Sequence, residues 1–174
     1  MVVEDRGLAD VLDERREAVI KEWLVRTLRT YPEATTRFLF QEADTFRNPV
    51  GYALKEGLRA LFDGLVESRN ASVMAPVLDN IVRIRAVQDF TASQAVAFVF
   101  LLKQVIREEL KNSIEQYWND LTPLEARIDE MALLAFDVFM QCRQQICEIR
   151  VNEAKRRVSL LERAFQAEPS DQTR

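Results

Sequence analysis

Histidine is absent from this 174-residue chain, and that absence excludes several kinds of site at once. Histidine is the commonest general base, the usual proximal haem ligand and a favoured zinc ligand. A di-iron helical bundle normally needs Glu-x-x-His on two helices, so the acidic residues of the helices are expected to lie on exposed faces. No nucleophile with a base and no phosphate loop is recognisable. We predict no catalytic residue, no metal site and no cofactor, and therefore a protein that is not an enzyme.

Glycine and proline are scarce, with four and five residues respectively. The many tight turns of a β-sandwich or barrel need more of both. The chain is long enough for one domain with a substantial core. The composition therefore predicts an all-α helical bundle.

Long apolar runs and an apolar N-terminal signal segment are also missing, and the longest run, Ala95 to Leu102, is interpreted as a buried helix face. Cys142 and Cys147 lie five residues apart on one predicted helix, where their side chains point to different faces and a disulfide is not expected. These features predict a cytoplasmic protein with no membrane span.

Charge of one sign does not dominate the chain. Charged residues make up 30% of it in both signs, and the net charge is −4. Nucleic-acid binding requires a basic face, so no nucleic-acid partner is predicted. The basic run Lys155-Arg156-Arg157 is interpreted as a solvated helix face.

Apolar residues at helical spacing predict a first helix over residues 8–30, which ends at Tyr31-Pro32. Asn48 as N-cap and Pro49 at the first helical position predict a second long helix that reaches about Ser68. Further helices are predicted over residues 74–87 and 92–117.

A group of polar residues interrupts the apolar pattern between residues 81 and 94. Thr91-x-x-Gln94 predicts a capping box at a helix start. In one interpretation Arg83, Arg85, Gln88 and Gln94 surround a polar pocket in which guanidinium groups hold a carboxylate or phosphate. In the other, these residues tie helix ends together, Asp89 pairs with an arginine, and Asn48 and Gly51 serve only their turn.

The last predicted helix begins with Thr122 as its cap and Pro123 at its first position, and no glycine or proline follows until Pro169. Its first part should face the bundle through Ile128, Met131, Ala135, Val138 and Cys142. After a break, the apolar positions restart at spacings of four, three, four, three and four, which is the pattern of a coiled-coil seam. The seam residues are Cys147, Val151, Ala154, Val158, Leu161 and Phe165.

Such a seam must be paired or covered. A parallel homodimer pairs it, and a helix that folds back on its own bundle covers it. We predict a helical regulatory domain over residues 1–146, a projecting amphipathic helix end over 147–167, and a disordered tail over 168–174.

Two segments carry a family resemblance: FRNPVGYALKEGL, from Phe46 to Leu58, and IVRIRAVQDFTASQAVAFVFLLK, from Ile81 to Lys103. Together they resemble the N-terminal domain of RsbT co-antagonist proteins of the RsbRD type, over about residues 8 to 150. The resemblance implies a bacterial signalling module with a dimeric, globin-like fold without haem. In full-length relatives a STAS output domain follows; here the chain ends at Arg174, so a stand-alone form is expected and phosphorylation of an output domain is not carried over.

The resemblance and the seam together predict a non-enzymatic stress-response regulator that acts by protein–protein interaction, as a homodimer or paired with a related signalling protein. The alternative is a small-ligand sensor or carrier. Its pocket would be the arginine-lined one described above, or an apolar cavity lined by Phe98, Phe100, Phe136 and Phe139.

Overall fold

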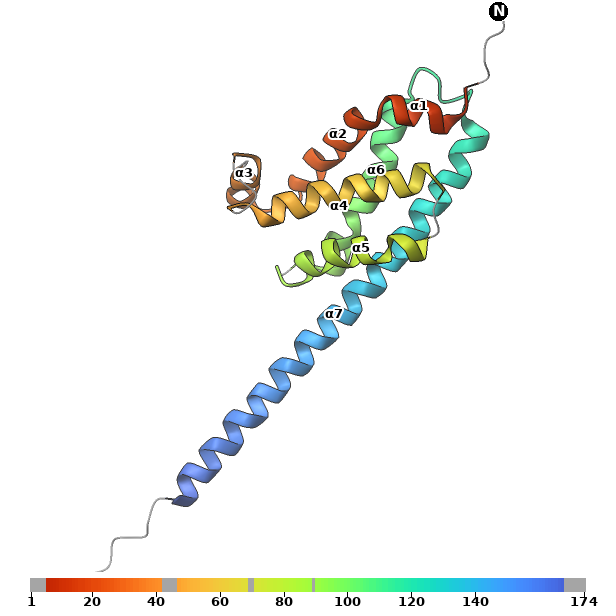
Figure 1. Ribbon diagram of the computed structural model, residues 1–174. Helices are drawn as coiled ribbons and strands as arrows, with labels where there is room; N and C mark the ends of the chain where they lie inside the picture. The colour runs from red at the N-terminus through yellow and green to blue at the C-terminus, as the bar shows by residue number, and fades with distance from the viewer. Residues whose placement is uncertain (1–5, 42–46, 69–70, 89, 168–174) are drawn as a thin grey trace, which may run out of the picture.

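The computed structural model describes residues 6–41, 47–68, 71–88 and 90–167, except for the side chains of residues 40–41, 71–72 and 164–167 (Figure 1). Over these residues it is built from helices alone, which confirms the predicted all-α bundle with a long C-terminal helix. The predicted disordered tail, residues 168–174, lies outside the described residues. The helices are α1 (Leu8–Glu14), α2 (Arg16–Leu28), α3 (Glu33–Gln41), α4 (Pro49–Val66), α5 (Ala71–Ala86), α6 (Ala92–Glu109) and α7 (Trp118–Ala167).

The predicted helix over residues 8–30 is wrong in one respect, because it is divided at Arg15. This residue has φ −97° and ψ 7°, outside the helical region, and α2 starts immediately after it. The guanidinium of Arg15 donates to the backbone oxygen of Glu109 at the end of α6. This tertiary contact lies at the break between α1 and α2. It cannot be predicted from helical periodicity.

The boundary between the last two helices also differs from the prediction. Helix α6 ends at Glu109, not near residue 117, and α7 begins at Trp118. Thr122 is therefore not an N-cap: its hydroxyl donates to the carbonyl of Trp118 one turn earlier, at 3.2 Å. Pro123 lies in the second turn of α7, where it cannot donate the backbone hydrogen bond to Asn119. Likewise, α5 starts at Ala71, three residues before the expected position, and contains Pro76.

The core lies between α7 and the helices that pack on it. Helix α7 packs against α5 and α6, α2 packs against α6 and α4, and α4 packs against α5. Ion pairs Arg107–Glu125 and Lys103–Asp129, both with a shortest distance of 2.6 Å, connect the antiparallel helices α6 and α7. The predicted bundle-facing residues Ile128, Met131, Ala135, Val138 and Cys142 are all buried, as expected from their spacing.

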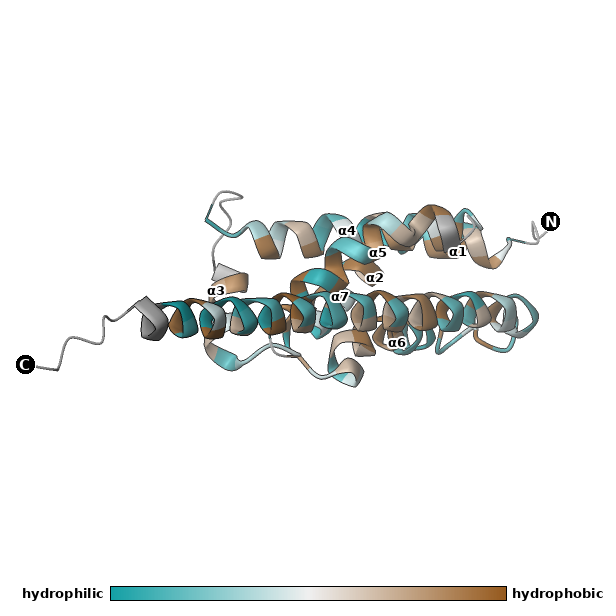
Figure 2. Ribbon diagram, turned by 90° about the horizontal axis from the view of Figure 1, so that it is seen from below, coloured by the Kyte–Doolittle hydropathy of each residue, from teal (hydrophilic) through white to brown (hydrophobic). Residues whose placement is uncertain are grey.

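The C-terminal half of α7 leaves the bundle and extends well beyond it (Figure 1). Figure 2 shows hydrophobic residues recurring along this projecting part, between hydrophilic ones. A helix folded back on its own bundle is therefore excluded for the described residues, and Cys147 to Leu161 are exposed apart from Ser159, which is half-buried. In the described part of the chain, none of the helices combines the length and apolar character that a bilayer crossing requires.

Candidate functional site

Among the residues that the structure describes, Arg85 is the one arginine that is completely buried, with 0% of its surface exposed. It comes from the last turn of α5 and points into the interior. Its Nη2 donates to the hydroxyl of Thr30 at 2.8 Å, just beyond the end of α2, and to the carbonyl of Gln94 at 3.0 Å, in the first turn of α6. The side chain therefore joins the ends of three helices.

Aromatic rings surround the Arg85 guanidinium. Its central carbon lies 4.3 Å from the ring centroid of Phe90, 4.9 Å from that of Tyr31 and 5.7 Å from that of Phe98. Such cation–π contacts are stronger where water is excluded. Even so, Nε and Nη1 of Arg85 and the hydroxyl of Tyr31 are buried without a hydrogen-bond partner among the residues described. Burial lowers the pKa of Arg85 and raises the pKa of Tyr31 from their ordinary values.

Arg83 lies on a different side of α5 from Arg85, as two residues of separation require in a helix. It is exposed, donates to Asp79 at 2.6 Å within α5, and reaches Gln145 of α7 at 3.3 Å. Gln88 is also exposed, and its backbone N–H donates to the carbonyl of Arg85 at 3.2 Å. The structure thus does not gather these residues around one pocket; Asp89 lies outside the described residues.

The Thr91–Gln94 capping box is confirmed. The N–H of Gln94 donates to the Thr91 hydroxyl at 3.3 Å, and the Thr91 N–H donates to the Gln94 side chain at 3.0 Å. Its local geometry places the Gln94 carbonyl within reach of Arg85. Arg85 and Gln94 thus join helix ends here.

Asn48 and Gly51 form a separate structural site at the start of α4. The side-chain oxygen of Asn48 accepts from the Gly51 N–H at 2.8 Å, and its Nδ2 donates to the carbonyl of Leu39 in α3 at 3.1 Å. A Cβ at position 51 would lie 2.4 Å from Asn48 Nδ2, closer than real contacts allow. Glycine is thus required so that the N-cap side chain can fold over the first turn.

Asn48→Ala is expected to lower the free energy of unfolding by about 1–2 kcal/mol, because it removes an N-cap and a buried bond to α3. Asn48→Asp keeps the acceptor for Gly51 but places a carboxylate oxygen against the Leu39 carbonyl, so it should also be less stable than the wild type. Urea unfolding of the three proteins measures both. Equal stability of the alanine variant and the wild type would contradict the assigned role.

Helix α7 carries two separate apolar faces. The residues from Ile128 to Cys142 that face the bundle are buried, and the predicted seam from Cys147 onward lies on another side of the same continuous helix. The predicted break between Cys142 and Cys147 is thus a change of face and not an interruption of the helix. Val151, Val158 and Leu161 are 45%, 54% and 59% exposed, while the side chain of Phe165 lies outside the described residues.

Sequence reasoning missed the beginning of this exposed face. Leu133, Phe136 and Met140 are 69%, 45% and 49% exposed, although they lie beside the bundle. With Gln144 they precede Cys147 at spacings of three, four, four and three, so they continue the seam towards the N-terminus of α7. We call the exposed face from Leu133 to Leu161 the α7 stripe. Reading the alternating spacing backwards from Cys147 would have found Met140 and Leu133, although not Phe136.

The apolar cavity predicted from four phenylalanines is wrong. Phe98 and Phe139 are buried in the core, whereas Phe100 and Phe136 are each 45% exposed, so the four cannot line one cavity. Phe98 is fixed instead by Trp23: the rings stack at 6.3 Å, and Trp23 Nε1 donates to the Phe98 carbonyl at 2.6 Å. The sequence could not exclude Phe100 and Phe136 from the cavity, because periodicity does not say which side of a helix is covered.

Within the described part of the chain, His, Cys, Asp and Glu side chains form no group of three or more that would hold a metal ion. Both cysteines are free thiols, Cys142 buried and Cys147 exposed, as expected from their positions on one helix.

Comparison with known proteins identifies the family but no individual relative. No curated protein and no solved structure matches the chain, so the globin-like arrangement stays a prediction. Residues 17–153 match the model of the RsbT co-antagonist protein rsbRD N-terminal domain, which spans most of the helical bundle and the first part of the α7 stripe. The all-helical chain with its projecting α7 therefore belongs to this family of bacterial regulatory signalling domains.

Proposed function

We propose that this domain, in the cytoplasm, acts as a non-enzymatic module that pairs with a second copy of itself through the α7 stripe. The observation that carries the proposal is the stripe itself: Val151, Val158 and Leu161 are about half-exposed on a helix that has left its bundle. An uncovered apolar stripe of this kind normally marks a protein–protein contact. The two free thiols support a reducing compartment.

The residue types on the seam favour a two-stranded partner. Taking Val151 and Val158 as a positions places Ala154 and Leu161 at d positions. β-Branched residues at a with leucine at d favour parallel dimers. At about 1.5 Å per residue, the stripe from Leu133 to Leu161 is roughly 42 Å long, enough for several layers of contact.

The charges beside the seam favour the parallel orientation. In a parallel pair each g residue faces the e residue five positions later on the partner helix. Arg143 then faces Glu148 and Arg157 faces Glu162, while Arg150 faces Lys155. Two of these three pairings are attractive, although Arg143 also donates to the Ala86 carbonyl of its own chain at 3.5 Å.

An antiparallel pair would bring like charges together. There g faces g and e faces e, so the three arginines at g would meet one another and the glutamates at e would meet glutamates. The same surface thus attracts a second copy in one orientation and repels it in the other. Pairing with a related signalling protein would need the same a, d, e and g pattern on that partner.

Leu161→Glu is expected to dissociate the pair, because it places a charge at a d position of the apolar seam. The matched control is Leu160→Glu, the same change on an exposed neighbour that lies off the seam. Light scattering should report a dimer for the wild type and the control, and a monomer for Leu161→Glu. The bundle should stay folded, since both residues lie beyond it. A monomeric wild type, or equal masses for all three proteins, would overturn the proposal.

A further inference from the structure

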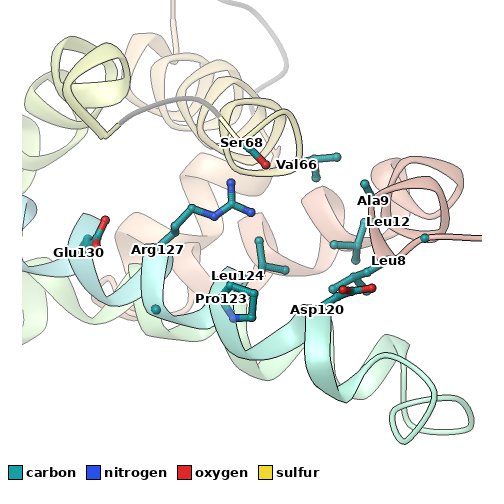
Figure 3. A pocket seen from close by; sticks show the side chains of 12 residues that line it. Leu8, Ala9, Leu12, Val66, Ser68, Asp120, Pro123, Leu124, Arg127 and Glu130 are labelled. Atoms are coloured by element: carbon teal, nitrogen blue, oxygen red, sulfur yellow. The ribbon is translucent and has the colours of Figure 1, made fainter.

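A pocket of about 680 Å³ lies between α1, the end of α4 and the first turns of α7 (Figure 3). Its apolar wall includes Leu8 and Leu12 of α1, Val66 of α4 and Leu124 of α7. The volume falls in the range of about 300–1,000 Å³ that small-molecule sites occupy. The pocket lies towards the N-terminal end of α7, whereas the seam residues begin at Cys147.

Arg127 supplies the cation of this pocket. Its Nη1 is buried without a hydrogen-bond partner among the described residues. By contrast, Arg16, which is also partly buried, is held by both carboxylate oxygens of Asp63 at 2.6 and 2.7 Å. Figure 3 shows the Arg127 guanidinium extending from α7 across the pocket towards Ser68 at the end of α4. An unpaired buried donor on a charged group is costly, and an acceptor from outside would remove that cost.

Ser68 is the second polar group and holds an unusual conformation. Its φ of 57° is the only positive value at a non-glycine residue in the described chain. It stands directly after the C-cap of α4, the position where helices commonly end on glycine, and its N–H donates to the Leu65 carbonyl at 3.2 Å. Serine there costs backbone strain, and it contributes to the pocket a hydroxyl that glycine lacks.

We propose that this pocket binds a small amphipathic monocarboxylate, such as an alkyl carboxylic acid. The carboxylate accepts hydrogen bonds from Arg127 and Ser68, since a planar guanidinium matches a carboxylate in two parallel bonds. The hydrocarbon part lies against Leu8, Leu12 and Leu124. The inference does not depend on the proposed pairing of α7.

Two acidic residues of the pocket limit the charge of the ligand. Asp120 lies two helical turns before Arg127, beside Leu8, and Glu130 follows Arg127 by three residues and points away from it (Figure 3). A dianionic headgroup such as a phosphate monoester would meet repulsion from both. A single negative charge placed at Arg127 meets the least repulsion, which favours a carboxylate over a phosphate.

Sodium decanoate, titrated below its micelle concentration into the full chain and followed by calorimetry, tests this assignment. We expect saturable binding of one decanoate per chain. Arg127→Gln should weaken binding by ~10- to 100-fold, the range expected for losing a hydrogen bond to a charged group. Arg156→Gln is the matched control, because Arg156 is an exposed arginine of α7 that lies outside the pocket and off the seam. Decyl phosphate should bind more weakly than decanoate, and decyltrimethylammonium should not bind.

Two further variants test the pocket without removing the cation. Ala9→Trp, at an exposed residue on the rim, should block binding by filling the space, with little effect on the core. Glu130→Gln should tighten binding slightly, since it removes a negative charge from the lining of the pocket. No saturable binding to the wild type, or equal binding by Arg127→Gln at an unchanged melting temperature, would overturn the inference. So would decyltrimethylammonium or decyl phosphate binding as tightly as decanoate.

Discussion

Arg85→Ala is expected to lower the free energy of unfolding by about 3–5 kcal/mol, the range for truncating a large buried side chain to alanine. The side chain fills the space between Tyr31, Phe90 and Phe98, and it bridges the end of α2 to the start of α6. Its removal leaves a cavity at the point where three helices meet. Urea unfolding with a common m-value measures the change.

Arg85→Met separates the volume of this side chain from its charge. Two of the guanidinium nitrogens are buried without acceptors, so the charge itself is poorly compensated. Replacing a buried charge by an apolar side chain of similar size is often neutral or stabilising. The Thr30 hydroxyl would keep its bond to the Thr27 carbonyl at 2.6 Å. We therefore expect Arg85→Met to stay within about 1 kcal/mol of the wild type, or to exceed it.

Arg83→Ala is the surface control for these two variants. Arg83 pairs with Asp79 in water, and exposed pairs of this kind contribute about 0–1 kcal/mol. A cost for Arg85→Met as large as that for Arg85→Ala would show that the guanidinium contacts stabilise the fold. A cost for Arg83→Ala equal to that of Arg85→Ala would contradict the division of the two arginines between the surface and the core.

Mild oxidation of the wild-type protein is expected to join two chains covalently through Cys147. This thiol is free and exposed and stands at a d position of the seam. In a parallel, in-register pair each d residue faces its own copy, close enough for a disulfide. In an antiparallel pair centred on Ala154, Cys147 would lie opposite Leu161, about 21 Å away along the helix from the partner thiol. Cross-linking therefore reports orientation as well as contact.

Cys142 provides the internal control for the cross-link. It is buried in the bundle, so Cys142→Ser should leave the covalent dimer intact, whereas Cys147→Ser should abolish it. Non-reducing gel electrophoresis distinguishes these outcomes. A protein that is dimeric by light scattering yet forms no Cys147 cross-link would exclude the parallel in-register geometry, even if Leu161→Glu dissociates it.

The sequence by itself determined the features that depend on neighbours within one helical turn. The N-cap Asn48 and the Thr91–Gln94 box were predictable because their partners lie three residues away. The buried face from Ile128 to Cys142 was predictable because its spacing matches the helical repeat. Helical class followed from the shortage of glycine and proline.

Only the tertiary structure decided which side of each helix is covered. Arg83 and Arg85 look alike in sequence, yet the packing of α5 buries one among aromatic rings and leaves the other in water. Leu133 and Phe136 look like core residues, yet α5 and α6 cover another face of α7. Arg127 and Ser68 are distant along the chain, and the packing of α4 and α7 brings them to one pocket. The physical reason is that helix–helix contacts join residues tens of positions apart, and local periodicity carries no information about that pairing.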